Sequence, residues 1–164
     1  MDLDRAAVEI TKDFKEVVFV GAYAAIHYGV LRGTHDIDLA LASPVTEEGF
    51  RKLGYGVFNE GGKKVIRTRH GLKLDVYTKD VSGIPVPQIF ATAVTVRAAG
   101  SPVRIMCLEA LLLAKMRAGR PQDSDDIQQL CRLRGKSVRW EVVGSMANSL
   151  ERTELKGYVR ALTR

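Results

Sequence analysis

The stretch RGTHDIDLAL, residues 32–41, carries two aspartates, Asp36 and Asp38, at the start of an apolar run. In an extended strand, residues i and i+2 point to the same face, so these two carboxylates lie side by side. Two carboxylates among apolar neighbours are costly unless a cation lies between them. Hard divalent metals prefer such oxygen ligands and often bind phosphate as well. Asp-x-Asp pairs also occur as caps and turn residues, but Asp38 lies inside the strand pattern. We therefore expect a metal-dependent phosphoryl-transfer site.

The segments around this stretch predict a sheet. Residues 17–20, Val-Val-Phe-Val, form a short apolar run typical of a buried strand. Gly21 ends this run, and the helix expected at 22–28 closes at Gly29. Prolines predict a loop at 83–87. Further strands are expected at 36–42, 55–58, 64–69, 72–77, 91–97 and 103–105.

Helices precede the sheet and follow it. Thr46 is expected to begin a short helix, and Asp123 is the expected N-cap of a later one. The sequence predicts an α/β (α+β) fold, with a mixed sheet flanked by helices in residues 1–105 and a C-terminal helical bundle in residues 106–164, packed on that core. The longer helices are expected at 4–15, 108–117, 123–133, 138–150 and 151–162.

Asp75 is the candidate third carboxylate of the site. It lies in the middle of the expected strand at 72–77. Three carboxylates on two strands can hold two metal ions about 3.5–4 Å apart, the arrangement that activates a nucleophile and stabilises a leaving pyrophosphate. Asp75 is also a candidate base for the attacking hydroxyl. The alternative is a structural aspartate that pairs with Lys73 or Arg67.

Two further parts of the chain are candidates for contact with a nucleotide. Gly21 and Ala22 connect a strand to a helix, where backbone N–H groups can bind phosphate, although a glycine after a strand is often only a turn. Lys115 interrupts an apolar helix, so it either extends to solvent or points at a triphosphate. Arg120 follows, and it could pair with Asp123 or with Asp126, which otherwise serve as helix-start residues.

The charge of the chain is uneven. The net charge is +6, and residues 132–164 hold eight Lys and Arg against three Glu. A basic region on a near-neutral core suggests an anionic partner such as RNA. The alternative is a solvated helical surface. The basic side chains are Arg132, Arg134, Lys136, Arg139, Arg152, Lys156, Arg160 and Arg164.

Several function classes lack their signatures in this sequence. There is no Walker loop, no His and Cys cluster at metal-binding spacing, and no Ser or Cys nucleophile elbow. Cys107 and Cys131 lie in apolar helical patterns, so we expect reduced core cysteines. No apolar run approaches the roughly 20 residues of a membrane span, and no signal peptide is recognisable. We therefore expect a cytoplasmic protein without a membrane partner.

Taken in order, these segments resemble the DNA polymerase beta-like nucleotidyltransferase superfamily, and more closely the AbiEii-type and related small bacterial and archaeal nucleotidyltransferases. That family reads strand, Gly-Gly or Gly-Ser, helix, then Arg-x-Thr-x-Asp-Ile/Leu-Asp and a third Asp on a strand. An apolar helix with Lys and the motif Arg-x-Lys-Asp-x-x-Asp-Ile follow. The matching stretches are 17–29, 32–41, 72–77 and 108–130.

The resemblance implies a role for each matched residue. Asp36, Asp38 and Asp75 would bind Mg²⁺ or Mn²⁺. The triphosphate of the NTP substrate would lie along Gly21 and Ala22. The residues implied near the nucleotide or supporting it are Arg32, Thr34, Lys115, Arg120 and Asp123. Two departures bear on nucleotide binding, because Ala22 replaces the usual Gly or Ser and Gln122 replaces the usual Lys.

The resemblance implies transfer of a nucleoside monophosphate from an NTP to a hydroxyl group, with release of pyrophosphate. The basic last third favours RNA, and tRNA in particular, as the acceptor. A protein hydroxyl or a small molecule such as an aminoglycoside is the alternative acceptor. Two other possibilities are a catalytically silent binding protein, for example with a toxin–antitoxin partner, and a plain RNA-binding module.

Overall fold

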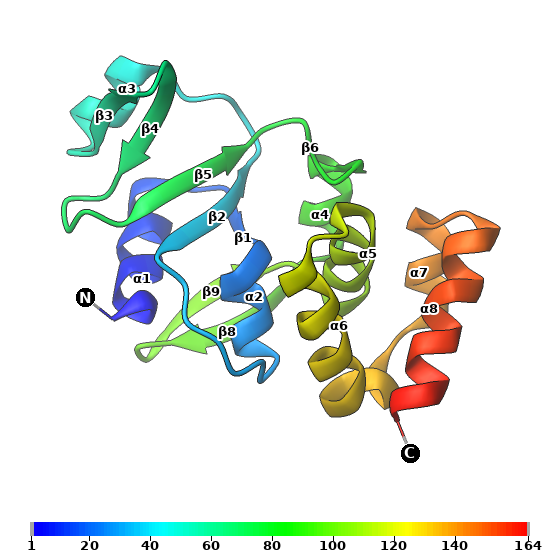
Figure 1. Cartoon of the computed structure of the whole chain (residues 1–164). Helices are drawn as coiled ribbons and strands as arrows, with labels where there is room; N and C mark the ends of the chain where they lie inside the picture. Colours follow the sequence, from blue (N-terminus) through cyan, green and yellow to red (C-terminus); the bar gives the residue numbers. More distant parts are fainter. Residues whose placement is uncertain (1, 164) are drawn as a thin grey trace.

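A mixed seven-stranded sheet forms the centre of the protein, whose computed structural model describes residues 2–163 (Figure 1). Its strand order is β3-β4-β5-β2-β1-β9-β8, and a separate hairpin pairs β6 with β7. This confirms the predicted fold class. The strands are β1 (Val17–Phe19), β2 (Asp36–Leu41), β3 (Gly56–Glu60), β4 (Lys63–Arg67), β5 (Lys73–Tyr77), β6 (Asp80–Val81), β7 (Ile84–Pro85), β8 (Val94–Ala98) and β9 (Ser101–Ile105).

The helices flank this sheet and then form a separate layer. In Figure 1, α5 and α6 stand between the sheet and the α7–α8 pair. The division into a core at 1–105 and a helical part at 106–164 stays a prediction. The helices are α1 (Leu3–Asp13), α2 (Gly21–His27), α3 (Glu47–Lys52), α4 (Val86–Thr92), α5 (Leu108–Ala118), α6 (Pro121–Arg134), α7 (Trp140–Met146) and α8 (Ser149–Leu162), with a 3₁₀ turn at Gly135–Ser137.

The centre of the sheet follows from its apolar strands. Every residue of β1 is buried, and β1 pairs antiparallel with β2 and parallel with β9. Strand β2 also pairs in parallel with β5, so it has a neighbouring strand along each of its two edges. Its residues alternate between the two faces: Ile37 and Leu39 enter the core, whereas Asp36 and Asp38 face the other way. The backbone therefore presents the aspartate pair without exposing apolar side chains.

The structure corrects three sequence expectations about elements. The predicted loop at 83–87 contains β7 and the first turn of α4, because a proline in the first helical turn loses no hydrogen bond. The helix expected at 138–150 is shortened to α7, because Asn148 caps α8 through a reciprocal pair of hydrogen bonds with Glu151. Asp123 is not an N-cap: α6 begins at Pro121, and Arg120 is the capping residue.

Two other expectations concern the cysteines and the membrane. Cys107 and Cys131 are free thiols in the core, as predicted. Within residues 2–163, no helix is both long enough and apolar enough to cross a membrane. The cytoplasmic location stays a prediction.

An ion pair between the buried Glu109 and the half-exposed Arg139 joins α5 to the start of α7. The Glu109 carboxylate is almost completely buried, and it accepts hydrogen bonds from the Arg139 backbone N–H at 2.8 Å, from Nε at 3.1 Å and from the terminal guanidinium nitrogen at 3.0 Å. Burial pushes the pKa of Glu109 up, but the hydrogen bonds from Arg139 outweigh burial and hold this pKa below its ordinary value. The pair therefore stabilises the fold when Glu109 is ionised.

Replacing Arg139 with Ala is expected to lower the free energy of unfolding by about 2–3 kcal/mol at pH 7, because Glu109 keeps its charge and loses its partner. The depressed pKa fixes the direction with pH: this stabilisation is full above the ordinary glutamate pKa of 4.5 and is lost as the pH falls below it. Urea unfolding at pH 7 and pH 4 measures the difference. An equal loss at both pH values would contradict the assignment, and a Glu109→Gln background should abolish the pH dependence.

Candidate functional site

The three predicted carboxylates come together on one face of the sheet. Because β2 and β5 run parallel in register, Asp38 lies beside Asp75 and Asp36 lies beside Lys73. Strand alternation puts all four side chains on the same face, and it adds Tyr77 to them. The side chains of Asp36 and Asp75 are 46% and 37% exposed, whereas Asp38 lies deeper. Asp36, Asp38 and Asp75 thus form an acidic group on this face of the sheet, called the acidic edge below. It is open to solvent, and Asp38 is its partly buried member.

The surroundings of Asp38 disfavour the ionised form of its carboxylate. Burial and the neighbouring carboxylate of Asp75 raise the pKa of Asp38 above its ordinary value. Arg120 and the backbone N–H of Ala22 oppose this effect, because both favour the ionised form. The net effect is a raised pKa, so the ionised form of Asp38 is unfavourable in these surroundings. A cation placed against Asp38 would relieve that cost.

A lysine lies against this acidic edge. Lys73 Nζ is 2.9 Å from Asp75 Oδ1, 3.0 Å from Asp75 Oδ2 and 4.0 Å from Asp36 Oδ2. The alternative interpretation of Asp75, a pairing with Lys73, is therefore what the structure has. Among residues 2–163, no three His, Cys, Asp or Glu side chains surround one metal-sized point as they stand. The donor set nevertheless fits a hard divalent cation, because three carboxylates lie in register on adjacent strands, and burial together with Asp75 disfavours the ionised form of the deepest one, Asp38.

Gly21 lies so close to Asp38 that no side chain fits there. It begins α2 with φ at +59°, a conformation that favours glycine. A Cβ added to Gly21 would overlap the Oδ2 oxygen of Asp38. The N–H of the next residue, Ala22, is directed at the Asp38 carboxylate. The predicted phosphate contact at this turn stays a prediction, and the structure shows the turn packed closely against Asp38.

Replacing Gly21 with Ala is expected to destabilise the protein by about 1–3 kcal/mol, since the backbone conformation is unfavourable and Asp38 must move. Gly33 offers a matched control, because its backbone angle is ordinary and a Cβ there meets nothing within 4 Å. Urea unfolding of both Ala variants measures the contrast. If Gly21→Ala and Gly33→Ala unfold at the same denaturant concentration, the close packing of Gly21 on Asp38 is wrong.

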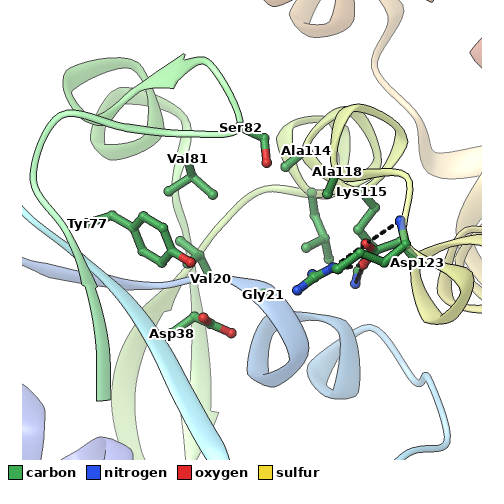
Figure 2. Close-up of a pocket in the computed structure, with 12 residues that line it drawn as sticks. Val20, Gly21, Asp38, Tyr77, Val81, Ser82, Ala114, Lys115, Ala118 and Asp123 are labelled. Carbon is green, nitrogen blue, oxygen red and sulfur yellow. Dashed lines mark hydrogen bonds and ion pairs between the residues drawn. The ribbon is translucent and has the colours of Figure 1, made fainter. Parts of the chain in front are cut away.

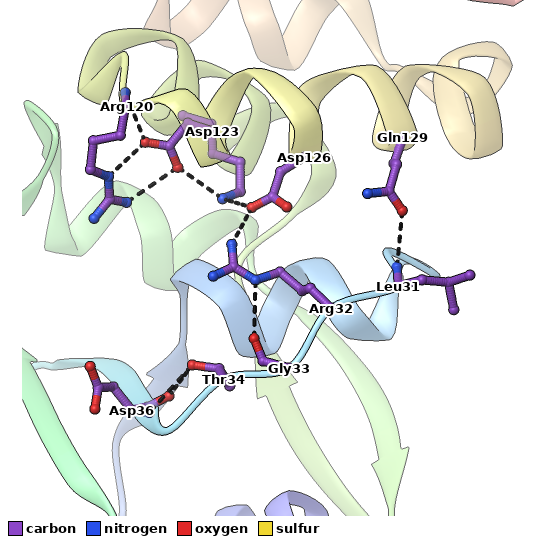
Figure 3. A network of polar contacts seen from close by, with 10 residues as sticks. Leu31, Arg32, Gly33, Thr34, Asp36, Arg120, Asp123, Asp126 and Gln129 are labelled. Atoms are coloured by element: carbon purple, nitrogen blue, oxygen red, sulfur yellow. Dashed lines mark hydrogen bonds and ion pairs between the residues drawn. The ribbon is translucent and has the colours of Figure 1, made fainter.

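A network of buried charges lies opposite the acidic edge, between α5 and α6 (Figure 3). Lys115 Nζ is 3.2 Å from Asp123 Oδ1 and 2.5 Å from Asp126 Oδ2, and all three side chains are buried. Arg120 binds Asp123 through two parallel hydrogen bonds, of 2.7 Å to Oδ2 and 3.2 Å to Oδ1. The ammonium group of Lys115 is therefore used inside the protein, and Asp123 orients Arg120.

Arg32 connects this network to the loop before β2. Its guanidinium lies 2.7 Å from the same Asp126 oxygen that Lys115 contacts. Thr34 has a local role, because its hydroxyl donates to the Asp36 carbonyl and accepts the Asp36 N–H. Thus Thr34 sets the turn that begins β2, and Asp126 holds Arg32 toward the site (Figure 3).

Two adjoining cavities collect the predicted residues. Both cavities are lined by Asp38, Lys115 and Arg120, which connect them. The first, of about 110 Å³, is also lined by Ala22, Arg32, Thr34, Asp36, Asp75 and Gln122. The second, of about 80 Å³, lies between β2–β5 and α5–α6 (Figure 2), and it adds Val20, Gly21, Tyr77, Val81, Ser82, Leu111, Ala114, Ala118 and Asp123.

Sequence reasoning missed three residues of this site. Lys73 and Tyr77 could have been assigned to the site face from the alternation of β5, since both lie two residues from Asp75. Burial raises the pKa of Tyr77, and the nearby Asp38 and Asp75 add to this effect, which places the phenol beside the carboxylates. Asp126 was treated as a helix-start residue, and nothing in the sequence shows its contact with Arg32, 94 positions away.

Comparison with known proteins supplies the family. The model of a family described as "Nucleotidyl transferase of unknown function (DUF2204)" matches residues 2–163. No curated protein matches the chain in sequence. The predicted resemblance to the nucleotidyltransferase superfamily is therefore confirmed by a match over almost the whole chain.

Three solved structures share the fold. An antigenic nucleotidyltransferase-like protein from Paracoccidioides brasiliensis is 16% identical, with a TM-score of 0.62 over 98% of this chain and 93% of that one. The antibiotic-resistance factor ANT(2'')-Ia in solution is 19% identical, with a TM-score of 0.56 over 99% and 96%. The crystal structure of ANT(2'')-Ia with adenylyl-2''-tobramycin is 16% identical, with a TM-score of 0.58 over 94% and 97%. With this fold and the family match over residues 2–163, the chain belongs to the nucleotidyl transferase family of unknown function, DUF2204.

Proposed function

We propose that this nucleotidyltransferase moves a nucleoside monophosphate from an NTP to a hydroxyl group of an acceptor, with a divalent metal ion bound at the acidic edge. The observation that carries the proposal is the parallel register of β2 and β5, which sets Asp38 beside Asp75 and next to Asp36. The raised pKa of Asp38, due first to burial and then to Asp75, supports a site built around a cation.

The reaction requires one bond to form and one to break. The acceptor hydroxyl oxygen attacks the α-phosphorus, and the bond from this phosphorus to the oxygen bridging to the β-phosphate breaks, so pyrophosphate leaves. The hydroxyl proton passes to a carboxylate, for which Asp75 is the candidate base. Held by Asp36, Asp38 and Asp75, a divalent metal would supply Lewis-acid stabilisation of the charge on the transferring group and on the leaving pyrophosphate.

The chain supplies its own cations across from the carboxylates. Arg32 and Arg120 both line the first cavity, and buried aspartates orient their guanidinium groups. A guanidinium fixed in this way can bind phosphate oxygens with two donors. We infer that these arginines bind the triphosphate, while Lys115 acts mainly as the internal counter-ion of Asp123 and Asp126. Catalysis would then rest on positioning and electrostatics.

The acceptor that the charge of the chain favours is RNA. Arg152 and Lys156 lie along α8 on the side of α7, where Lys156 stands over the Trp140 ring at 5.6 Å and Arg152 approaches Gly144. A basic helix surface with an aromatic ring suits a phosphate backbone. The exposed basic side chains of this region are Arg132, Arg134, Lys136, Arg139, Arg152, Lys156 and Arg160. Arg164, which was counted with them, lies outside the described residues.

A small hydroxyl compound is the second candidate acceptor. A cavity of about 190 Å³ shares Lys115 and Arg120 with the site, and Glu154 and Tyr158 of α8 line its far side. On α8 these two residues lie on the helix face opposite Arg152 and Lys156, so the α8 side of this cavity is aromatic and acidic. Such a surface suits a compact, cationic alcohol better than a polyanion.

Label transfer decides between these acceptors. The protein is incubated with Mg²⁺ and each α-³²P-labelled NTP, together with either total cellular RNA or an aminoglycoside mixture. RNA transfer is expected to carry label into RNA and to fall steeply between 50 and 200 mM salt, about 10-fold or more. Label in the aminoglycoside fraction, with little dependence on salt, would favour the second candidate. No label with any nucleotide in either fraction would count against the proposed function.

A further inference from the structure

Lys73 is the cation that lies against the acidic edge in this structure. Its ammonium contacts both Asp75 carboxylate oxygens, at 2.9 and 3.0 Å, and reaches Asp36 Oδ2 at 4.0 Å. The side chain is only one-third exposed, so it lies along the edge and does not extend into solvent. Asp75, one of the three proposed metal ligands, is therefore already paired with a cation of the chain, and Asp36 lies at the outer limit of an ion pair with the same ammonium.

The position of Lys73 follows from the register of the sheet. Lys73 pairs with Asp36 across the β2–β5 ladder and precedes Asp75 by two residues on the same strand. A side chain at this point is directed to the same face as both aspartates, whatever rotamer it adopts. A cation bound between Asp36 and Asp75 would therefore meet the Lys73 ammonium within a few ångströms, where like charges repel strongly.

We propose that Lys73 is the counter-ion of the acidic edge in the absence of metal. A divalent metal ion must displace the Lys73 ammonium to bind there, so Lys73 weakens metal binding until a nucleotide is present. The inference rests on the proposed function for the identity of the metal ligands. The triphosphate of an NTP would offer the displaced ammonium a new partner, because Arg32 and Arg120, the proposed triphosphate contacts, line the same cavity as the aspartates. Metal and nucleotide would then bind with positive coupling.

Mn²⁺ titration, followed by the electron paramagnetic resonance of the free ion, tests this directly. Without nucleotide, Lys73→Gln is expected to bind Mn²⁺ about 10-fold more tightly than the natural protein, because one positive charge leaves the edge. Lys73→Arg, which keeps the charge, should stay within about 2-fold. Lys12→Gln, an exposed lysine on α1, controls for net charge and should also stay within about 2-fold. With a non-hydrolysable NTP analogue present, the gap between Lys73→Gln and the natural protein should narrow.

Thermal unfolding gives a second readout that does not depend on catalysis. Without metal, Lys73→Gln should melt lower than the natural protein, because the carboxylates lose their counter-ion. Added Mn²⁺ should raise the melting temperature of Lys73→Gln more than that of the natural protein.

The measurements distinguish a failure of the Lys73 inference from a failure of the proposed metal site. Equal Mn²⁺ affinity in Lys73→Gln and the natural protein, with binding still abolished by Asp38→Asn, would overturn the role of Lys73 and leave the metal site in place. Weaker NTP binding by Lys73→Gln in EDTA, with unchanged Mn²⁺ affinity, would make Lys73 a nucleotide contact and would also overturn the inference. No Mn²⁺ binding by any variant, with or without the analogue, would remove both the inference and the proposed metal site.

Discussion

Replacing Asp38 with Asn is expected to reduce nucleotidyl transfer by roughly a thousandfold, because the site loses several kcal/mol of metal-linked stabilisation of the transition state. The fold should survive this change. Asn keeps the shape of Asp38 and can still accept the Ala22 N–H, while the charge that burial and Asp75 make costly is gone. We therefore expect the metal-free variant to melt at the same temperature as the natural protein at pH 7, or above it.

The two readouts separate a functional carboxylate from a structural one. Rates of α-label incorporation and melting temperatures are measured side by side. Asp125→Asn is the matched control, because Asp125 is exposed on α6 and away from the strands, and it should leave both quantities nearly unchanged. If Asp38→Asn kept more than a tenth of the activity, or if it melted several degrees lower, Asp38 would have a different role.

Replacing Lys115 with Met is expected to lower the free energy of unfolding by about 3–5 kcal/mol, since two buried carboxylates lose their shared cation. Asp123 keeps Arg120 and Asp126 keeps Arg32, but Lys115 is the only one of these three cations that is itself buried. Urea unfolding measures the loss. Lys12→Met, which removes an exposed lysine from α1, should change stability by less than about 0.5 kcal/mol.

A double-mutant cycle tests whether Lys115 acts through Asp126. Adding Asp126→Asn to Lys115→Met removes the buried charge that the first change leaves without its closest partner. The loss of unfolding free energy in the double variant should therefore be smaller than the sum of the losses in the two single variants, by about 1–3 kcal/mol. Additive losses, or a Lys115→Met variant as stable as the natural protein, would contradict the pairing of Lys115 with Asp126.

The sheet half of the site could be predicted because strand alternation is a local rule. Asp36, Asp38 and Asp75 were identified from single strands, and the register of β2 with β5 brings them together. The same rule would have found Lys73 and Tyr77, which were not assigned to the site. Charge alone cannot show whether a lysine at such a site contacts the nucleotide or pairs with a carboxylate. In the structure Lys73 pairs with Asp75.

The helical half could not be predicted in the same way. The sequence leaves the direction of Lys115 open, because a lysine in an apolar helix either extends to solvent or turns inward to a partner. That partner is Asp126, which also holds Arg32 from a loop almost a hundred residues earlier, and such a contact depends on packing alone. The N-cap assignment of Asp123 was wrong because Pro121 is a favoured first residue of a helix, which moves the cap back to Arg120.

The acidic edge is proposed to bind the metal ion of a nucleotide site. Calorimetric titration of a non-hydrolysable NTP analogue, with and without Mg²⁺, into the natural protein and into Asp38→Asn tests it most directly. We expect the analogue to bind the natural protein more tightly with Mg²⁺ than without it, and to bind Asp38→Asn with an affinity that Mg²⁺ does not change. Equal affinities in both proteins, unaffected by Mg²⁺, would contradict this proposal.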